Sequence, residues 1–253
     1  MIQPEDAFGE TMNEQTYSPV VFFVLILAFV VLAGCVYAPA HVNFKNPDEL
    51  AAAMNKSHLH SIKALISVNM HVNGRYMSFP ESIIIDGNAM RLETLNIFYQ
   101  PVLIIIYNGT AAVMDVNKGT CGVTSSSVLR QYTRMDVEPV YFEKLITARL
   151  IGKPDRLYDT EKGIMLYGKT GRTIWSSVLN DDLLLTSTTA QYMSGDTVTC
   201  TYKDHDTIDG ITLAMHVTCD WGDNRIAVHY KNVRVNVPVD SSLMDTHKLC
   251  GYD

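Results

Sequence analysis

The side chains best suited to chemistry in this sequence are five cysteines and eight histidines. Thiolate and imidazole groups are preferred ligands of zinc. His216 with Cys219, and His247 with Cys250, are each spaced by three residues, but neither pair belongs to a four-ligand motif such as CxxC with CxxC. We therefore expect no metal and no other cofactor.

The sequence contains no pattern that would support hydrolysis. It has no Gly-x-Ser-x-Gly elbow, no Ser-x-x-Lys pair, no HExxH and no glycine-rich phosphate loop. Asp181, Asp182 and the group Asp204, Asp206 and Asp209 fall in turn-like sequence, where Asp bonds its own backbone. We therefore expect that the chain is not an enzyme. A glycan-acting hydrolase, which would need paired carboxylates in a polar cleft, is a third class of function.

Cys35 differs from the other cysteines because it follows an unbroken apolar run, VVFFVLILAFVVLA, over residues 20–33. The run has the length of a signal-peptide h-region and is shorter than the roughly 20 residues of a spanning helix. The string LAGC at residues 32–35 resembles a lipobox, in which the thiol accepts diacylglycerol. We predict a lipoprotein signal peptide over residues 1–34, cleaved between Gly34 and Cys35, and a tether over residues 35–45 that is lipidated on Cys35.

The same segment leaves alternatives open. The uncharged stretch continues through residue 40, so the run could be an uncleaved membrane anchor. The first basic residue is Lys45, which departs from the positive n-region of signal peptides, and a start at Met12 would not change this. Val36 follows the lipid cysteine in place of the Asp that commonly retains lipoproteins in the inner membrane. By resemblance to known sorting rules, this favours the outer membrane.

Composition and charge limit the kinds of partner. The chain is 47% apolar and 19% charged, as in an ordinary globular protein that buries a sizeable core. The net charge is −7, and four acidic residues precede Cys35 without any Lys or Arg, so the remainder carries −3. No cluster of basic residues interleaved with aromatic residues is present, which argues against nucleic acid. We expect one folded domain over residues 46–253.

The elements of this domain are predicted to be mainly strands. Helices are expected over residues 47–58 and 139–150, the second ending at a Gly-Lys-Pro stop. Period-two alternation predicts a long, half-buried strand over residues 61–72. Further strands are expected over residues 77–85, 90–97, 102–107, 110–116, 163–167, 173–178, 183–189, 197–203, 211–220 and 226–237. The fold class is therefore mainly β with two or more helices, a strongly curved antiparallel sheet with helices on its concave side.

From residue 61 onward the order of the predicted strands, loops and helix resembles that of the lipoprotein-sorting superfamily of the LolA/LolB type. The strand SIKALISVNMHV is followed by MRLETLNI, the loop FYQPV, LIIIYNG, TAAVMDVNKG and PVYFEKLITARLIGKP, which is similar to the helix of the outer-membrane receptor. The later YKDHDTIDGITLAMHVTC and RIAVHYKNVRVNVPVD are similar to the closing hairpins. The resemblance implies an incomplete, half-open barrel around a hydrophobic cavity for acyl chains.

The resemblance also implies which residues line that cavity. Apolar walls suit an acyl chain because each methylene removed from water gains about 0.8 kcal/mol. The candidate wall residues are Ile66, Val68, Leu92, Ile104, Ile106, Leu145 and Ile146. The alternative for each of them is a place in a dry core.

A second implication concerns residues 96–101. In the outer-membrane receptor, the loop between the third and fourth strands projects an apolar side chain that helps lipoproteins enter the membrane. Phe98 and Tyr99, beside Pro101, match this loop by position and would suit the headgroup boundary. Ordinary hairpin packing is the alternative.

Without Cys35, the remaining four cysteines form an even set that an oxidising periplasm allows to pair in three ways. We favour Cys200 with Cys219, because the midpoint between them falls in the Asp-Gly turn signal at residues 209–210. The same register would place two aspartates opposite apolar residues, so a longer loop is an alternative. Four buried free thiols are another.

Together these features predict an outer-membrane lipoprotein on the periplasmic face that binds acyl chains or the lipid moieties of lipoproteins and serves lipoprotein localisation. The expected partners are the membrane, through the N-terminal lipid, acyl chains or lipoproteins, and a periplasmic carrier, without nucleic acid. The alternative is a non-enzymatic structural or interaction lipoprotein of the cell envelope with the same fold.

Overall fold

One antiparallel sheet organises the described part of the computed structural model, which comprises residues 46–54, 59–124 and 137–251. Within these residues the sheet has thirteen strands in the order β6-β5-β4-β3-β2-β1-β13-β12-β11-β10-β9-β8-β7. Its edge strands β6 and β7 do not pair with each other, so the sheet stays open. The predicted signal peptide, Cys35 and the tether to residue 45 lie outside the described residues.

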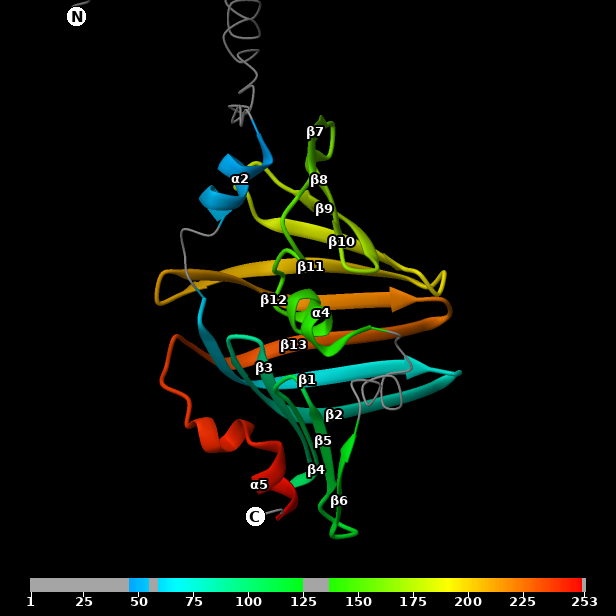
Figure 1. Ribbon diagram of the computed structural model, residues 1–253, viewed down its shortest axis with the longest axis vertical. Helices are drawn as coiled ribbons and strands as arrows, with labels where there is room; N and C mark the ends of the chain where they lie inside the picture. Colours follow the sequence, from blue (N-terminus) through cyan, green and yellow to red (C-terminus); the bar gives the residue numbers. More distant parts are fainter. Residues whose placement is uncertain (1–45, 55–58, 125–136, 252–253) are drawn as a thin grey trace, which may run out of the picture. The chain divides into compact units, whose positions relative to one another are not determined.

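Two meanders build the sheet and meet at its centre. The first contains β1 (Ser61–Val72), β2 (Arg75–Asp86), β3 (Ala89–Leu95), β4 (Pro101–Tyr107), β5 (Ala111–Asp115) and β6 (Thr120–Thr124). The second contains β7 (Arg156–Thr160), β8 (Gly163–Thr170), β9 (Thr173–Leu179), β10 (Leu185–Tyr192), β11 (Thr197–Ile208), β12 (Ile211–Trp221) and β13 (Asn224–Val235). The first and last strands pair in the middle, with Val68 opposite Val228. In Figure 1 the strands turn from nearly horizontal at β11 to steep at β4–β6, which shows the strong twist of the sheet.

Short helices flank the sheet. They are α2 (Pro47–Met54), α4 (Pro139–Ile146), the 3₁₀ turn η1 (Ser241–Met244) and α5 (Thr246–Cys250). The chain passes from edge strand β6 to the opposite edge strand β7 by way of α4, which lies over β12 and β13 in Figure 1. Among the described residues, no helix has the length and apolarity needed to cross a membrane.

The core lies between α4 and the sheet face that it covers. Alternation along β1 turns Ile62, Ile66 and Val68 into this core, each no more than 2% exposed. From α4, Phe142 and Leu145 pack into the same cluster. Burial of each such side chain stabilises the folded state by about 2 kcal/mol, so the long strand β1 contributes strongly to the stability of the domain.

The opposite face of the first meander is also covered, which the sequence did not predict. η1 packs beside β3, and α5 packs against β5 and β6. The Asn108 side chain donates to the carbonyl oxygen of Met244 at 2.7 Å. A disulfide between Cys121 of β6 and Cys250 of α5 fixes this C-terminal segment to the sheet.

Cys200 and Cys219 form the second disulfide, on directly opposite positions of β11 and β12. The two strands pair as far as Ile208 and Ile211, so the connection is a tight turn and not a longer loop. Both turn residues, at 209–210, have positive φ, as a type I′ hairpin requires. Asp206 stands opposite Leu213 yet stays exposed, which removes the objection to this register.

The predicted fold class is confirmed: strands dominate, the sheet is antiparallel and open, and the arrangement is a half-open barrel with few helices. Several bounds differ. The helix predicted over residues 139–150 ends at Ile146, and strands β6 and β7 were not predicted. The end of the first predicted helix, at residues 55–58, lies outside the described residues.

Replacing Gly168 with Ala should destabilise the domain by about 1 to 3 kcal/mol, because an added Cβ would overlap the Trp175 ring. Trp175 is 1% exposed, and its Nε1 donates to Thr170 Oγ1 at 3.1 Å, so the ring has little room to move. Urea unfolding measures the change. Gly122→Ala is the control, because nothing lies within 4 Å of its added Cβ; equal stability of the two variants would contradict this packing.

Candidate functional site

A cleft of about 710 Å³ opens where α2, the segment after α4 and the β11–β12 hairpin meet. This volume lies in the range of small-molecule sites, roughly 300–1,000 Å³. One part of its lining is apolar, from Met54, Leu59, Leu150, Ile211 and Leu213, and another part is charged, from Lys144, Arg149, Lys153 and Asp48. The cleft is therefore amphipathic.

The end of α4 shapes one wall of the cleft. The Thr147 hydroxyl donates to the carbonyl oxygen of Glu143 at 2.8 Å and competes with the continuing helix. Ala148 then takes φ +53°, and the N–H of Arg149 returns to the carbonyl oxygen of Lys144 at 2.8 Å. The predicted continuation of the helix to Leu150 was wrong for this reason. The turn instead brings Arg149 and Leu150 to the cleft.

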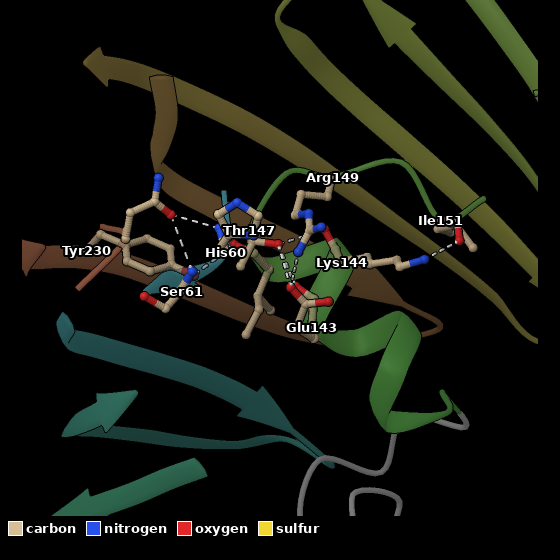
Figure 2. Close-up of polar contacts among 10 residues, drawn as sticks. His60, Ser61, Glu143, Lys144, Thr147, Arg149, Ile151 and Tyr230 are labelled. Carbon is tan, nitrogen blue, oxygen red and sulfur yellow. Dashed lines mark hydrogen bonds and ion pairs between the residues drawn. The ribbon is translucent and has the colours of Figure 1, made fainter. Parts of the chain in front are cut away.

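The start of β1 shapes another wall. The Asn236 side-chain oxygen accepts from the N–H of His60 at 2.7 Å and from the N–H of Ser61 at 3.5 Å. The Ser61 hydroxyl donates to the carbonyl oxygen of Val237 at 2.7 Å. Figure 2 shows His60 and Ser61 to one side of the contact residues of α4, with Tyr230 beside Ser61. The chain segments before β1 and after β13 are thus held together next to the cleft.

A buried carboxylate supports the cationic side of the cleft. Glu143 is 1% exposed, and its Oε1 accepts from Arg149 Nη1 at 3.1 Å and from the Thr147 hydroxyl at 3.3 Å. Its Oε2 has no hydrogen-bond partner among the described residues. Burial raises the pKa of Glu143, and the positive charge of Arg149 opposes that shift. Figure 2 shows Glu143, Thr147 and Arg149 converging at the end of α4.

The two lysines of the cleft are held differently. Lys144 Nζ donates to the carbonyl oxygen of Ile151 at 2.8 Å, and burial lowers the pKa of Lys144. Lys153 Nζ lies 3.0 Å from Asp48 Oδ1, and both side chains are largely exposed. Of these two lysines, only Lys153 has a carboxylate at ion-pair distance among the described residues.

None of the predicted wall residues lines this cleft. Ile66, Val68, Leu92, Leu145 and Ile146 are buried in the core between sheet and helix. They fill space that the resemblance assigned to an acyl chain.

Ile104 and Ile106 were placed on the wrong face of the sheet. Leu92 pairs with Ile105, so Ile105 shares the core face and its two neighbours face away. Ile104 and Ile106 are buried on the side of Arg91, whose Nη1 donates to the carbonyl oxygen of Leu243 in η1 at 2.9 Å.

The loop between β3 and β4 exposes three apolar side chains. Ile97 is 84%, Phe98 75% and Tyr99 64% exposed. The Asn96 side chain accepts from the N–H groups of Phe98 and Gln100 at 2.8 and 3.0 Å and fixes the loop. These side chains do not pack into the hairpin, and Ile97 adds to the two residues that the sequence indicated.

The two His-Cys spacings do not bring a thiol to an imidazole. Cys219 and Cys250 are each in a disulfide. His216 instead stacks on His229 across β12 and β13 and contacts Asp204 through Nδ1. Within the described ranges no group of three or more His, Cys, Asp or Glu side chains is placed to hold a metal ion.

The cleft residues Lys144, Arg149 and Lys153 were missed as site residues. The sequence feature that could have indicated them is a set of three basic residues within the ten positions of a largely apolar segment, KLITARLIGK. Such spacing is common on solvated helices, so the signal alone would not have separated a site from a surface.

Comparisons with known proteins place the fold. No family model and no curated protein matches the chain. Among solved structures, a DUF1329 family protein from Desulfovibrio piger is similar with a TM-score of 0.59 and 11% identity over 79% of this chain and 96% of that one. An outer membrane lipoprotein-sorting protein domain from Vibrio parahaemolyticus has a TM-score of 0.58 and 8% identity over 81% and 97% of the two chains.

A LolA superfamily protein from Nitrosomonas europaea is similar with a TM-score of 0.55 and 11% identity, covering 79% of this chain and 98% of that one. The resemblance drawn from the sequence is therefore confirmed at the level of the fold. The described domain shares its fold with these three solved structures.

Glu81 is the one acidic residue that faces the core side of β2. It pairs in register with Ile66 on one side and Thr94 on the other. The Thr94 hydroxyl donates to Glu81 Oε1 at 2.8 Å. Burial raises the pKa of Glu81 to about 7, against the smaller effect of this hydrogen bond.

Replacing Glu81 with Gln should flatten the pH dependence of stability between about pH 4.5 and 7. In that window the unfolded chain has lost the Glu81 proton while the folded chain still holds it. The free energy of unfolding of the unsubstituted protein therefore falls as pH rises, until the folded carboxyl also ionises. Urea unfolding across the window measures the slope. Glu161→Gln, in an exposed turn, should keep the original slope; a Glu81→Gln slope equal to it would refute the assignment.

Proposed function

We propose that this chain is a non-enzymatic, lipid-anchored protein of the bacterial cell envelope that binds an acyl chain, free or carried by a lipoprotein. The amphipathic cleft beside α4 carries the proposal. It occurs in a fold shared with structures described as a lipoprotein-sorting domain and a LolA superfamily protein. The anchor would be lipid on Cys35, after removal of residues 1–34, and the site of action the periplasmic face of the outer membrane.

The cleft suits an acyl chain physically. Its apolar wall includes Leu150, Ile211 and Leu213. An acyl chain bound against this wall leaves water without burying a polar group that lacks a hydrogen-bond partner. About ten methylenes would gain on the order of 8 kcal/mol before the costs of association. Two disulfides fit an oxidising compartment such as the periplasm. A periplasmic carrier would deliver or receive the cargo there.

Leu150→Glu should weaken acyl-chain binding at least about tenfold, because it places a carboxylate against the bound methylenes. Displacement of a fluorescent fatty acid from the full chain measures the affinity. Ile174→Glu is the matched control, since Ile174 is an aliphatic residue that is 55% exposed outside the cleft. If both variants bind like the unsubstituted protein, the cleft is not the acyl site.

The exposed β3–β4 loop would touch the membrane in this function. With the protein anchored in vesicles whose phospholipids carry an acyl-chain photolabel, the peptide with Phe98 and Tyr99 should be labelled. The double variant Phe98→Ser, Tyr99→Ser should lose that label, because exposed aromatic side chains settle at the headgroup boundary. The control is the exposed pair Tyr158 and Tyr167 on β7 and β8, which should stay unlabelled. Equal labelling of both peptides would argue against a docking loop.

Cys35→Ala should abolish incorporation of radiolabelled palmitate and leave an uncleaved precursor, because this thiol is the proposed lipid acceptor. Metabolic labelling followed by gel electrophoresis measures both effects. Cys250→Ala, which removes a disulfide partner only, should keep the label. A Cys35→Ala chain that carries the same label and stays in the membrane at the same size as the unsubstituted protein would show that Cys35 is not the acceptor and that the apolar run is an uncleaved anchor.

A further inference from the structure

The charge of the cleft is opposite to that of the chain. Three Lys or Arg residues and one Asp line the cleft, which gives its lining a charge of +2, whereas the whole chain carries −7. A local excess of positive charge in a partly enclosed apolar site attracts anions more strongly than the same charges in open solvent.

The three cations differ in how much of their charge is already neutralised. Asp48 holds Lys153. Glu143 holds Arg149 through Nη1, and the other guanidinium donors have no protein partner among the described residues. Lys144 Nζ donates to the neutral carbonyl oxygen of Ile151, and no carboxylate in the described part of the chain lies at ion-pair distance from it. The charge of Glu143 acts on Lys144 from farther away and only partly offsets the effect of burial on its pKa.

The Lys144 ammonium group has lost part of its solvation by water. It is partly buried near the end of α4 and, like Leu150, lines the cleft. Removal from water disfavours its charged form and lowers its pKa. A bound anion would restore the lost solvation with a charge-assisted hydrogen bond, the strong kind.

We propose that the cleft selects amphiphiles with an anionic head group, a carboxylate or phosphate, which Lys144 Nζ binds while the acyl chain lies against Leu150, Ile211 and Leu213. The unoccupied donors of Arg149 lie in the same lining and supply a second contact. This inference rests on the proposed function, because it names the class of lipid that the acyl site takes.

The test uses the full chain in nanodiscs of zwitterionic lipid and three photoactivatable probes with the same acyl chain. One probe ends in a carboxylate, one in a phosphate and one in an alcohol. Mass spectrometry measures cross-linking to the cleft peptides against probe concentration. The two anionic probes should reach half-maximal labelling at a concentration roughly tenfold lower than the alcohol.

Three variants assign this preference to the lysine. Lys144→Met keeps the side-chain length and should bring the anionic probes to the level of the alcohol, and Lys144→Arg should retain the preference. Lys169→Met, an exposed lysine on β8, is the control and should change nothing. Loss of the preference in Lys169→Met as well would overturn the role of Lys144.

The outcomes separate this inference from the proposed function. Cleft labelling that is equal for all three probes would overturn the head-group preference and leave acyl binding intact. No cleft labelling by any probe would remove both. Displacement of the phosphate probe by an equal concentration of inorganic phosphate would show a site for the free anion, and would also overturn the proposal. These comparisons need only the unsubstituted chain, so they hold even if Lys144→Met does not fold.

Discussion

The domain depends on how α4 covers the apolar face of an open sheet. The chain must travel from one sheet edge, β6, to the other, β7, and the helix on that path supplies Phe142 and Leu145 to the core. A helix of eight residues cannot cover all thirteen strands that the described residues form. The space beyond its last turn is bounded by α2, the returning chain and the β11–β12 hairpin, and this is where the cleft lies. The cleft is thus a consequence of helix length.

Polar contacts hold the C-terminal end of α4 in place. Tyr230 of β13 donates its hydroxyl to the carbonyl oxygen of Ile146 at 3.0 Å, inside the core. Thr147 and Arg149 both turn back to Glu143, so the first residues after the helix are held by a buried carboxylate. An uncompensated charge there would be costly, so Arg149 has a structural role besides lining the cleft. Stability and the electrostatics of the site therefore share residues.

The sequence predicted the fold better than the site, for physical reasons. Strand β1 was clear because its apolar residues alternate, whereas β7, RLYDT, is an edge strand without alternation. In β4, PVLIIIY, both faces are apolar, so no alternation indicates that Ile105 and not Ile104 faces the core. The cleft brings together segments about 60 residues or more apart in the sequence, such as those of Asp48, Lys153 and Ile211, and no local pattern records this arrangement.

The pairing of β1 with β13 also has a consequence for how the protein is made. Synthesis proceeds from the N-terminus, so β1 emerges long before its partner β13, which ends at Val235. Until then one edge of β1 is a row of unpaired backbone groups able to pair with other chains. A fold dominated by such distant pairings forms slowly. The nascent chain would therefore benefit from a chaperone that shields this edge until β13 has been made.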